Sequence, residues 1–224
     1  MGRDGVSEAL CLHSYWRSSA AYRVRIGLNL KGLRYEIIPV HLLRDGGEQR
    51  KPAFAEANPQ KLVPVLQHGK RMLRQSLAIL EYIDEVWPET PLLPATARDR
   101  QRVRALAQVV ACDVHPLNNL RVIQYFEHEW NVPQPERDAW VRHWIEEGFE
   151  AFETMLQNHP ATGDFCDGHA PSLADCCLVP QVYNARRFGV DLTPYPTIVR
   201  IEQACLALPA FDAARPERQP DAPG

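Results

Sequence analysis

The sequence predicts two parts, an α/β unit with a mixed sheet followed by an all-helical unit. Residues 10–87 contain segments in the order strand, helix, strand and then strand, strand, helix. Residues 88–96 hold three prolines and show no clear hydrophobic period, which is typical of a linker. Beyond residue 97, apolar residues recur at helical spacing without any strong strand signal. We therefore place one domain at residues 8–88 and a second at residues 97–224.

The α/β unit is predicted to begin with a strand, a helix and a second strand. Residues 10–15 form a short apolar run, and the apolar residues of 21–28 recur at helical spacing until Lys31-Gly32 ends the helix. Residues 35–41 form the second strand. Pro39 assigns this strand to a sheet edge, because proline lacks the N–H that a central strand needs.

A loop, a hairpin and a helix complete this unit. Residues 45–57 are polar and irregular and predict a loop. Residues 63–66 and 71–74 flank His68-Gly69, which is the pattern of a short antiparallel hairpin. The apolar spacing of residues 76–87 then predicts a helix that ends before a proline.

The second unit is predicted to consist of helices. An apolar face follows residues 103–110, Pro116 ends or kinks that helix, and residues 120–126 resume it. The aromatic and aliphatic residues of 136–156 stay near a period of 3.6, which predicts a long core helix.

The last part of the chain contains a helix start and a tail. Ser172 with Asp175 three residues later resembles a capping box, with aspartate in place of glutamate. Residues 209–224 are rich in proline, arginine and aspartate, and we expect an extended surface segment there.

Composition and charge narrow the possible functions. The 224 residues are 45% hydrophobic, and the formal net charge of −3 gives no reason to expect nucleic acid. Four arginines between residues 98 and 104 spread around a helix and are interrupted by Asp99, which favours a solvated or subunit-facing surface. No run approaches the roughly 18 apolar residues of a membrane span, and residues 1–8 are too charged for a secretory signal. We expect a cytoplasmic protein without membrane contact.

The six cysteines lack the spacing of a metal site or a disulfide framework. We expect buried free thiols in a reducing compartment and no metal. The cysteines are Cys11, Cys112, Cys166, Cys176, Cys177 and Cys205.

Two adjacent serines, Ser18 and Ser19, lie where the first strand gives way to the helix. Free N–H groups and the helix dipole favour negative charge there, and a hydroxyl directed at a thiolate would lower the pKa of that thiol. Because no cysteine lies in this motif, such a thiolate must arrive with a cofactor. The alternative is that the serines only cap the helix.

Several motifs follow one another in order along nearly the whole chain. They are Arg17-Ser18-Ser19-x-x-x-Arg23-Val24-Arg25-Ile26, Asn58-Pro59, Val63-Pro64, Gln75-Ser76-Leu77-Ala78-Ile79, residues 116–119, Ala174-Asp175, Val179-Pro180-Gln181-Val182 and residues 190–196. Together, in this order, they resemble the zeta class of the glutathione transferases. The resemblance implies a thioredoxin-like N-terminal domain, an all-α C-terminal domain, glutathione as cofactor and a homodimer.

The resemblance also implies the residues that contact glutathione in the first domain. Val63 and Pro64 match a cis-proline loop whose backbone pairs with the cysteinyl main chain. Gln75 and Ser76 would hold the γ-glutamyl carboxylate at a helix N-terminus. Gln49 would reach the glycyl end.

In the helical half, the resemblance places His115, Asn119 and Arg121 on the side that faces the site. A histidine such as His115, taken alone, is more often packed or solvated than a ligand. A linear dicarboxylate substrate needs cations at its two ends, and arginine matches carboxylate geometry with paired N–H donors. The resemblance implies that Arg17 and Arg187 bind these carboxylates.

The implied activity is glutathione-dependent cis–trans isomerisation of maleylacetoacetate to fumarylacetoacetate. Ser18 is implied to be the main hydrogen-bond donor to the glutathione thiolate. Maleylpyruvate is the alternative substrate, and Arg121 is the feature that favours it. Conjugation of glutathione to small α-halo acids and a non-catalytic glutathione-binding role are further alternatives. The family motif commonly has a cysteine after the two serines, whereas this chain has Ala20. A protein thiol therefore takes no part at that position.

Overall fold

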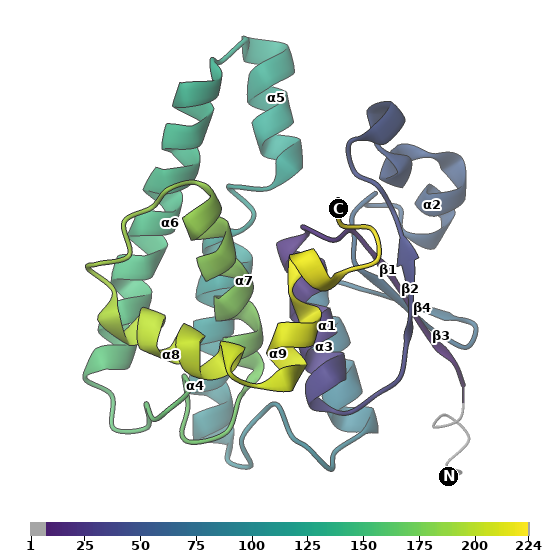
Figure 1. Cartoon of the computed structure of the whole chain (residues 1–224). Helices are drawn as coiled ribbons and strands as arrows, with labels where there is room; N and C mark the ends of the chain where they lie inside the picture. The colour runs from purple at the N-terminus through teal and green to yellow at the C-terminus, as the bar shows by residue number, and fades with distance from the viewer. Residues whose placement is uncertain (1–7, 224) are drawn as a thin grey trace. The chain divides into compact units, whose positions relative to one another are not determined.

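The computed structural model describes residues 8–223 and divides into two compact units (Figure 1). One unit runs up to Leu92 and also contains the chain from Leu208 onward, and the other is Leu93–Ala207. The predicted α/β and all-helical architectures are both present. The tail differs from the expected division of the chain, because residues 208–223 belong to the compact α/β unit.

The α/β unit follows the predicted order of elements with one correction. Residues 45–57, expected to be a loop, include two 3₁₀ turns and a short helix at Pro52–Ala57 (α2), which begins at Pro52 and contains the buried Phe54. The elements are β1 (Leu10–Ser14), α1 (Ser19–Leu30), β2 (Glu36–Pro39), 3₁₀ turns at Arg44–Gly46 and Glu48–Arg50, α2 (Pro52–Ala57), β3 (Val65–His68), β4 (Arg71–Arg74), α3 (Ser76–Val86), α9 (Pro209–Ala214) and a 3₁₀ turn at Pro216–Arg218.

The four strands form one mixed sheet in the order β2-β1-β3-β4. β1 pairs with β2 in parallel and with β3 in antiparallel fashion, so that Leu12 lies opposite both Ile37 and Leu66. β3 and β4 form the predicted hairpin. β2 is an edge strand, as Pro39 predicted, because the missing N–H costs no ladder bond there.

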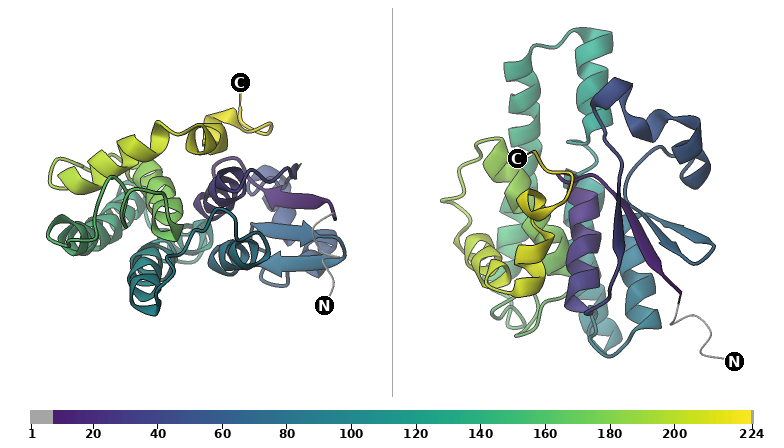
Figure 2. Two further views of the ribbon diagram at one scale, coloured as in Figure 1. Left: turned by 90° about the horizontal axis from the view of Figure 1, so that it is seen from below. Right: turned by 45° about the vertical axis from the view of Figure 1, so that its right-hand side comes forward.

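Helices α1 and α3 pack together on one face of the sheet, which Figure 1 shows and Figure 2 shows again from two other directions. Gly27 allows this close approach, because a Cβ at that position would overlap the side chain of Leu80. Val24, Ile26 and Leu28 are fully buried in the core of this unit.

The tail forms helix α9 and a 3₁₀ turn instead of the expected extended surface segment. Phe211, Ala214 and Pro216 are buried, and α9 packs beside α1 (Figure 2). Asn29 of α1 donates to the carbonyl of Ala210 over 2.9 Å. The apolar residues of the tail therefore complete the core of the α/β unit. The polar composition of the tail did not indicate this role.

A buried lysine fixes the start of the linker. The ammonium of Lys31 lies 2.8 Å from Asp84 Oδ1 and donates to the carbonyls of Trp87 and Thr90, and its side chain is 1% exposed. Asp84 also accepts the N–H of Leu92 over 2.7 Å. Every donor of the ammonium thus has an acceptor, which a buried cation requires.

All regular elements of the second unit are helices, and no strand occurs in residues 93–207. The long core helix is present, and Phe149, Phe152 and Leu156 lie on its buried face. The elements are α4 (Ala97–Gln108), a π-helical turn at Val109–Val114, α5 (Leu120–Trp130), α6 (Gln134–Gln157), α7 (Leu173–Arg187) and α8 (Pro196–Leu206).

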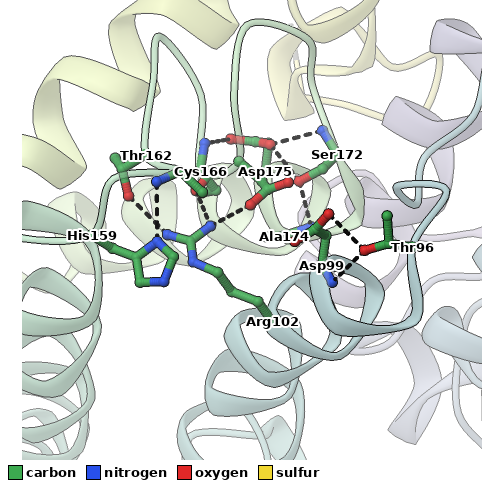
Figure 3. Close-up of polar contacts among 11 residues, drawn as sticks. Thr96, Asp99, Arg102, His159, Thr162, Cys166, Ser172, Ala174 and Asp175 are labelled. Carbon is green, nitrogen blue, oxygen red and sulfur yellow. Dashed lines mark hydrogen bonds and ion pairs between the residues drawn. The ribbon is translucent and has the colours of Figure 1, made fainter.

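The predicted capping box starts the buried helix α7 (Figure 3). Asp175 accepts from the N–H and the hydroxyl of Ser172, each over 2.8 Å, and from the N–H of Cys166 over 2.9 Å. Burial raises the pKa of the Asp175 carboxyl and that of the Cys166 thiol. Arg102 ties the same loop to α4 through Asp167, the carbonyl of Cys166 and Thr162.

All six cysteines are free thiols, as expected, but they are not all buried. Cys166, Cys176, Cys177 and Cys205 are buried, Cys11 is partly buried and Cys112 is exposed. Among the helices of residues 8–223, none is long and apolar enough to cross a membrane.

Candidate functional site

The two serines lie in a tight turn that begins helix α1. The N–H of Ser18 donates to the carbonyl of Tyr15 over 2.9 Å, which closes the turn. Ser18 is the N-cap, and its Oγ accepts the N–H of Ala21 over 3.2 Å. Because this oxygen serves as an acceptor to the helix, its own hydrogen can be donated to an anion. Ser19 is the first helical residue.

Arg17 occupies the turn before the cap. Its guanidinium lies over the ring of Trp16, with Cζ 5.2 Å from the ring centroid, a cation–π arrangement. Trp16 in turn packs against a buried apolar cluster that includes Tyr15 and Val63. The cation therefore rests on an aromatic surface next to the serines.

The Val63–Pro64 peptide bond is cis, and both residues are buried. Val63 packs in the same apolar cluster as Tyr15, which directly precedes the serine turn. This cluster brings the proline loop and the serine turn together, although some 45 residues separate them along the chain. Two of the sequence-predicted segments thus meet at one apolar cluster of the α/β unit.

Gln75 and Ser76 lie at the start of α3. Gln75 has a φ of 68°, in the left-handed region, and its side-chain amide donates to Gln60 Oε1 over 2.8 Å. Ser76 is 7% exposed, and its Oγ accepts from Arg23 Nη1 over 3.2 Å. Arg23 belongs to α1, so this helix links the serine at its N-terminus to the serine that begins α3.

Gln49 lies in the loop between β2 and α2 and is 6% exposed. Its Nε2 donates to the carbonyl of Leu42 over 3.4 Å, whereas its Oε1 is buried without a hydrogen-bond partner. A buried acceptor without a donor costs free energy. This side chain is therefore suited to receive an N–H from a bound molecule.

Three predicted residues of the helical unit share the segment between the π-helical turn and α5. His115 caps the π-helical turn and is partly buried. Asn119 is the N-cap of α5, and its side chain accepts the N–H of Arg121 over 3.2 Å. The side chain of Arg121 is exposed in the first turn of α5.

Arg187 is the last residue of α7. Its guanidinium lies 4.6 Å from the ring centroid of Phe188, and the residue is exposed. Arg186 beside it forms an ion pair with Glu202, whose side chain is 5% exposed. Both adjacent arginines are exposed, so the pair lies at the surface at the end of α7.

Sequence reasoning missed two residues of α1 that organise the site. Arg23 and Arg25 are 2% and 0% exposed, although both are charged. Arg25 donates to Ser14 Oγ and to the carbonyl of Trp16, each over 3.0 Å. The sequence signal for them is their position within an otherwise apolar helix, which indicates that both arginines are buried. A buried guanidinium requires fixed hydrogen-bond acceptors.

No group of three or more metal-ligating side chains occurs within residues 8–223. The candidate site is instead composed of hydroxyls, amides and guanidiniums, which suit an organic anion.

Comparison with known proteins identifies relatives over nearly the whole chain. The family model described as glutathione S-transferase, N-terminal domain, matches residues 17–86. A probable maleylacetoacetate isomerase of Vibrio cholerae is 51% identical over 214 residues, which cover 96% of this chain and 99% of that protein.

Two solved structures have the same fold. A bacterial maleyl pyruvate isomerase of the zeta class has a TM-score of 0.93 and 48% identity, over 95% of this chain and 100% of that chain. A maleylacetoacetate isomerase of Methylobacterium extorquens AM1 with bound malonate and glutathione has a TM-score of 0.92 and 45% identity. That match covers 96% of this chain and 100% of the other.

Proposed function

Because the chain belongs to the zeta class of the glutathione S-transferases, we propose that it is a glutathione-dependent cis–trans isomerase that converts maleylacetoacetate to fumarylacetoacetate. The observation that carries the proposal is the N-cap of α1. Ser18 Oγ accepts from the helix and keeps a hydrogen to donate, next to the positive end of the helix dipole. That combination stabilises a thiolate.

The residues of the α/β unit fit glutathione. Ser76 and Gln75 bind the γ-glutamyl carboxylate at the start of α3, with the buried guanidinium of Arg23 behind Ser76. The unpartnered Oε1 of Gln49 accepts an N–H near the glycyl end. The backbone of Val63, held by Pro64 and the apolar cluster, pairs with the cysteinyl main chain.

Glutathione, when bound, supplies the thiolate that adds reversibly to the maleyl double bond and so permits rotation about it. Ser18 donates a hydrogen bond to the sulfur and keeps it ionised at neutral pH. Ser19 adds an N–H at the helix start, where anions are favoured. Ala20 supplies no thiol of its own.

Arginines bind the substrate, which carries a carboxylate at each end. Arg17 binds one carboxylate next to the serines, and its guanidinium is supported by the ring of Trp16. Arg187 holds the other, and Phe188 supports it in the same way. His115, Asn119 and Arg121 contribute polar groups from the helical unit. Guanidiniums held before the substrate arrives stabilise charge without reorganisation.

Maleylpyruvate is a second candidate substrate, because Arg121 is exposed in the first turn of α5 and a relative with 48% identity is a maleyl pyruvate isomerase. The same arginines would also accept a small α-halo acid. A non-catalytic glutathione-binding role is disfavoured, since the Ser18 cap and the Gln75-Ser76 pair are both present.

Turnover of maleylacetoacetate and maleylpyruvate, measured side by side with glutathione, tests the proposal. We expect both to isomerise faster than with free glutathione, and maleylacetoacetate to give the higher kcat/KM. The isomerase function is wrong if neither substrate exceeds the rate with free glutathione. Release of chloride from a chloroacetate-type acid without isomerisation would favour the conjugation activity.

We also propose that the protein works as a cytoplasmic homodimer in the breakdown of aromatic amino acids. The motifs shared with the zeta class support this setting, as does the finding that no disulfide joins the cysteines of residues 8–223. Sedimentation at micromolar concentration tests the dimer.

A further inference from the structure

The serine turn leaves two backbone groups of Trp16 without partners inside the turn. The bond that closes the turn joins Ser18 N–H to the carbonyl of Tyr15. The carbonyl of Trp16 accepts instead from Arg25 Nη2 over 3.0 Å. The N–H of Trp16 donates to the carboxylate of Asp221 over 2.9 Å, a residue 205 positions further along the chain.

Asp221 is held firmly in place by the tail that carries it. Gln219 is 7% exposed, and its amide donates to the carbonyls of Ala213 and Arg215 over 3.1 and 2.8 Å. The N–H of Ala222 then returns to the carbonyl of Gln219 over 3.1 Å, which closes a turn around Asp221. Arg25 also donates to the carbonyl of Ala214 over 3.0 Å.

The tail and the serine turn are therefore one hydrogen-bonded unit with Arg25 at its centre. Arg25 is fully buried and cannot move without losing several acceptors. Asp221 accepts the N–H of Trp16, which lies two residues before Ser18. Loss of that contact would leave this N–H without its acceptor and loosen the start of the turn that carries Arg17 and Ser18.

We propose that Asp221 is a positioning residue for the Ser18 hydroxyl, so that the C-terminal segment controls how well the enzyme ionises bound glutathione. The inference rests on the proposed role of Ser18 as donor to the thiolate. Asp221 itself touches neither cofactor nor substrate in this scheme. It acts through the Trp16 N–H.

Two substitutions separate positioning from charge. Asp221→Ala removes the acceptor. Asp221→Asn keeps one oxygen to accept the Trp16 N–H, and it sacrifices no second bond, because Asp221 Oδ1 has no hydrogen-bond partner. The matched control is Arg218→Ala, which removes an exposed ion pair with Asp212 from the same segment.

The first measurement is hydrogen exchange of the Trp16 amide in the protein without glutathione. We expect this amide to be protected in the wild type, in Asp221→Asn and in Arg218→Ala, and to exchange faster in Asp221→Ala. Equal protection in Asp221→Ala and the wild type would show that the carboxylate does not hold the turn and would overturn the proposal.

The second measurement is the pKa of the bound glutathione thiol, followed by thiolate absorbance. Asp221→Ala should raise this pKa by about one unit and lower kcat about tenfold, whereas Asp221→Asn should stay within about twofold of the wild type. In a Ser18→Ala background, Asp221→Ala should have no further effect.

The outcomes distinguish the inference from the proposed function. If Ser18→Ala raises the thiol pKa and Asp221→Ala does not, the positioning role is wrong and the function stands. If neither substitution changes the thiol pKa, then Ser18 does not donate the hydrogen bond that stabilises the thiolate, and the inference is wrong as well. A full additional shift in the double variant would likewise overturn the inference, because Asp221 would then act without Ser18.

Discussion

The guanidinium of Arg23 donates a hydrogen bond to the hydroxyl of Ser76 over 3.2 Å, and both side chains are buried. Because the Ser76 oxygen already accepts from Arg23, its own hydrogen is available to a carboxylate. The same division of roles occurs at Ser18, which accepts from the helix and keeps a hydrogen for the sulfur. Each serine thus has one partner in the protein that orients it.

The first prediction concerns affinity for glutathione. Ser76→Ala should raise the Kd of glutathione roughly 10- to 100-fold, since a hydrogen bond to a charged group contributes about 1.5–3 kcal/mol. The control is a glutathione analogue with the γ-glutamyl carboxylate converted to an amide, whose binding should change little. Isothermal titration measures both. An equal loss for the two ligands would remove the carboxylate from the partners of Ser76.

The second prediction separates the two serines of the turn. Ser18→Ala should leave the Kd of glutathione within a small factor but raise the pKa of the bound thiol, because about 1.5–3 kcal/mol of stabilisation of the sulfur anion is lost. It should also cost about 1 kcal/mol of stability, since the Ala21 N–H loses its cap. Ser19→Ala should have the smaller effect on both. Equal thiolate absorbance at neutral pH in the wild type and both variants would contradict the prediction.

The third prediction concerns the buried ion pair of Lys31 and Asp84. Lys31→Met leaves a carboxylate that is 9% exposed without its cation and should cost about 3–5 kcal/mol in the free energy of unfolding. Urea denaturation measures this cost. The exposed pair of Arg218 and Asp212 is the control, and Arg218→Ala should cost less than about 1 kcal/mol. A loss for Lys31→Met as small as that of the control would contradict the burial argument.

The parts of the fold that were predicted from sequence depend on local patterns. The edge position of β2 follows from Pro39 alone, and the start of α7 follows from Ser172 and Asp175 within one turn. The position of Ser18 as N-cap is equally local, since a strand ends and a helix begins around it. Patterns of this kind carry their own physical reason and need no knowledge of distant contacts.

The parts that escaped prediction depend on contacts between distant segments. The pairing of Trp16 with Asp221 spans 205 positions and leaves no trace in either local pattern. The tail was expected to be extended because its prolines, arginines and aspartates suggested no apolar face. Phe211 and Ala214 are nevertheless buried, and their helix α9 packs beside α1. Residues 52–57 were misjudged for a similar reason, because only tertiary burial of Phe54 makes so short a helix stable.

The fourth prediction concerns Asp175 and pH. Asp175→Asn places an NH₂ group against a buried donor of Ser172 or Cys166, which should cost about 1–3 kcal/mol. Burial raises the pKa of Asp175 above its unfolded value, so the folded state binds this proton more tightly. That contribution to stability appears as the pH falls through the raised pKa. The advantage of the wild type over Asp175→Asn should therefore grow as the pH falls from neutral toward the unfolded-state pKa of about 3.9, as urea midpoints would show. A constant or shrinking difference would contradict this sign.

The last prediction concerns the choice between the two substrates. If Arg121 binds the distal carboxylate of maleylpyruvate, Arg121→Ala should lower kcat/KM for that substrate roughly 10- to 100-fold, equivalent to about 1.5–3 kcal/mol. Maleylacetoacetate is longer beyond the ketone and places this carboxylate further away, so its loss should be smaller. Arg187→Ala is the control, because it removes a carboxylate site that both substrates share. It should therefore lower kcat/KM for both substrates alike. An equal loss of kcat/KM for both substrates in Arg121→Ala would show that the exposed Arg121 has no role in selectivity. Maleylacetoacetate would then be the favoured substrate, because Arg121 is the residue that favours maleylpyruvate.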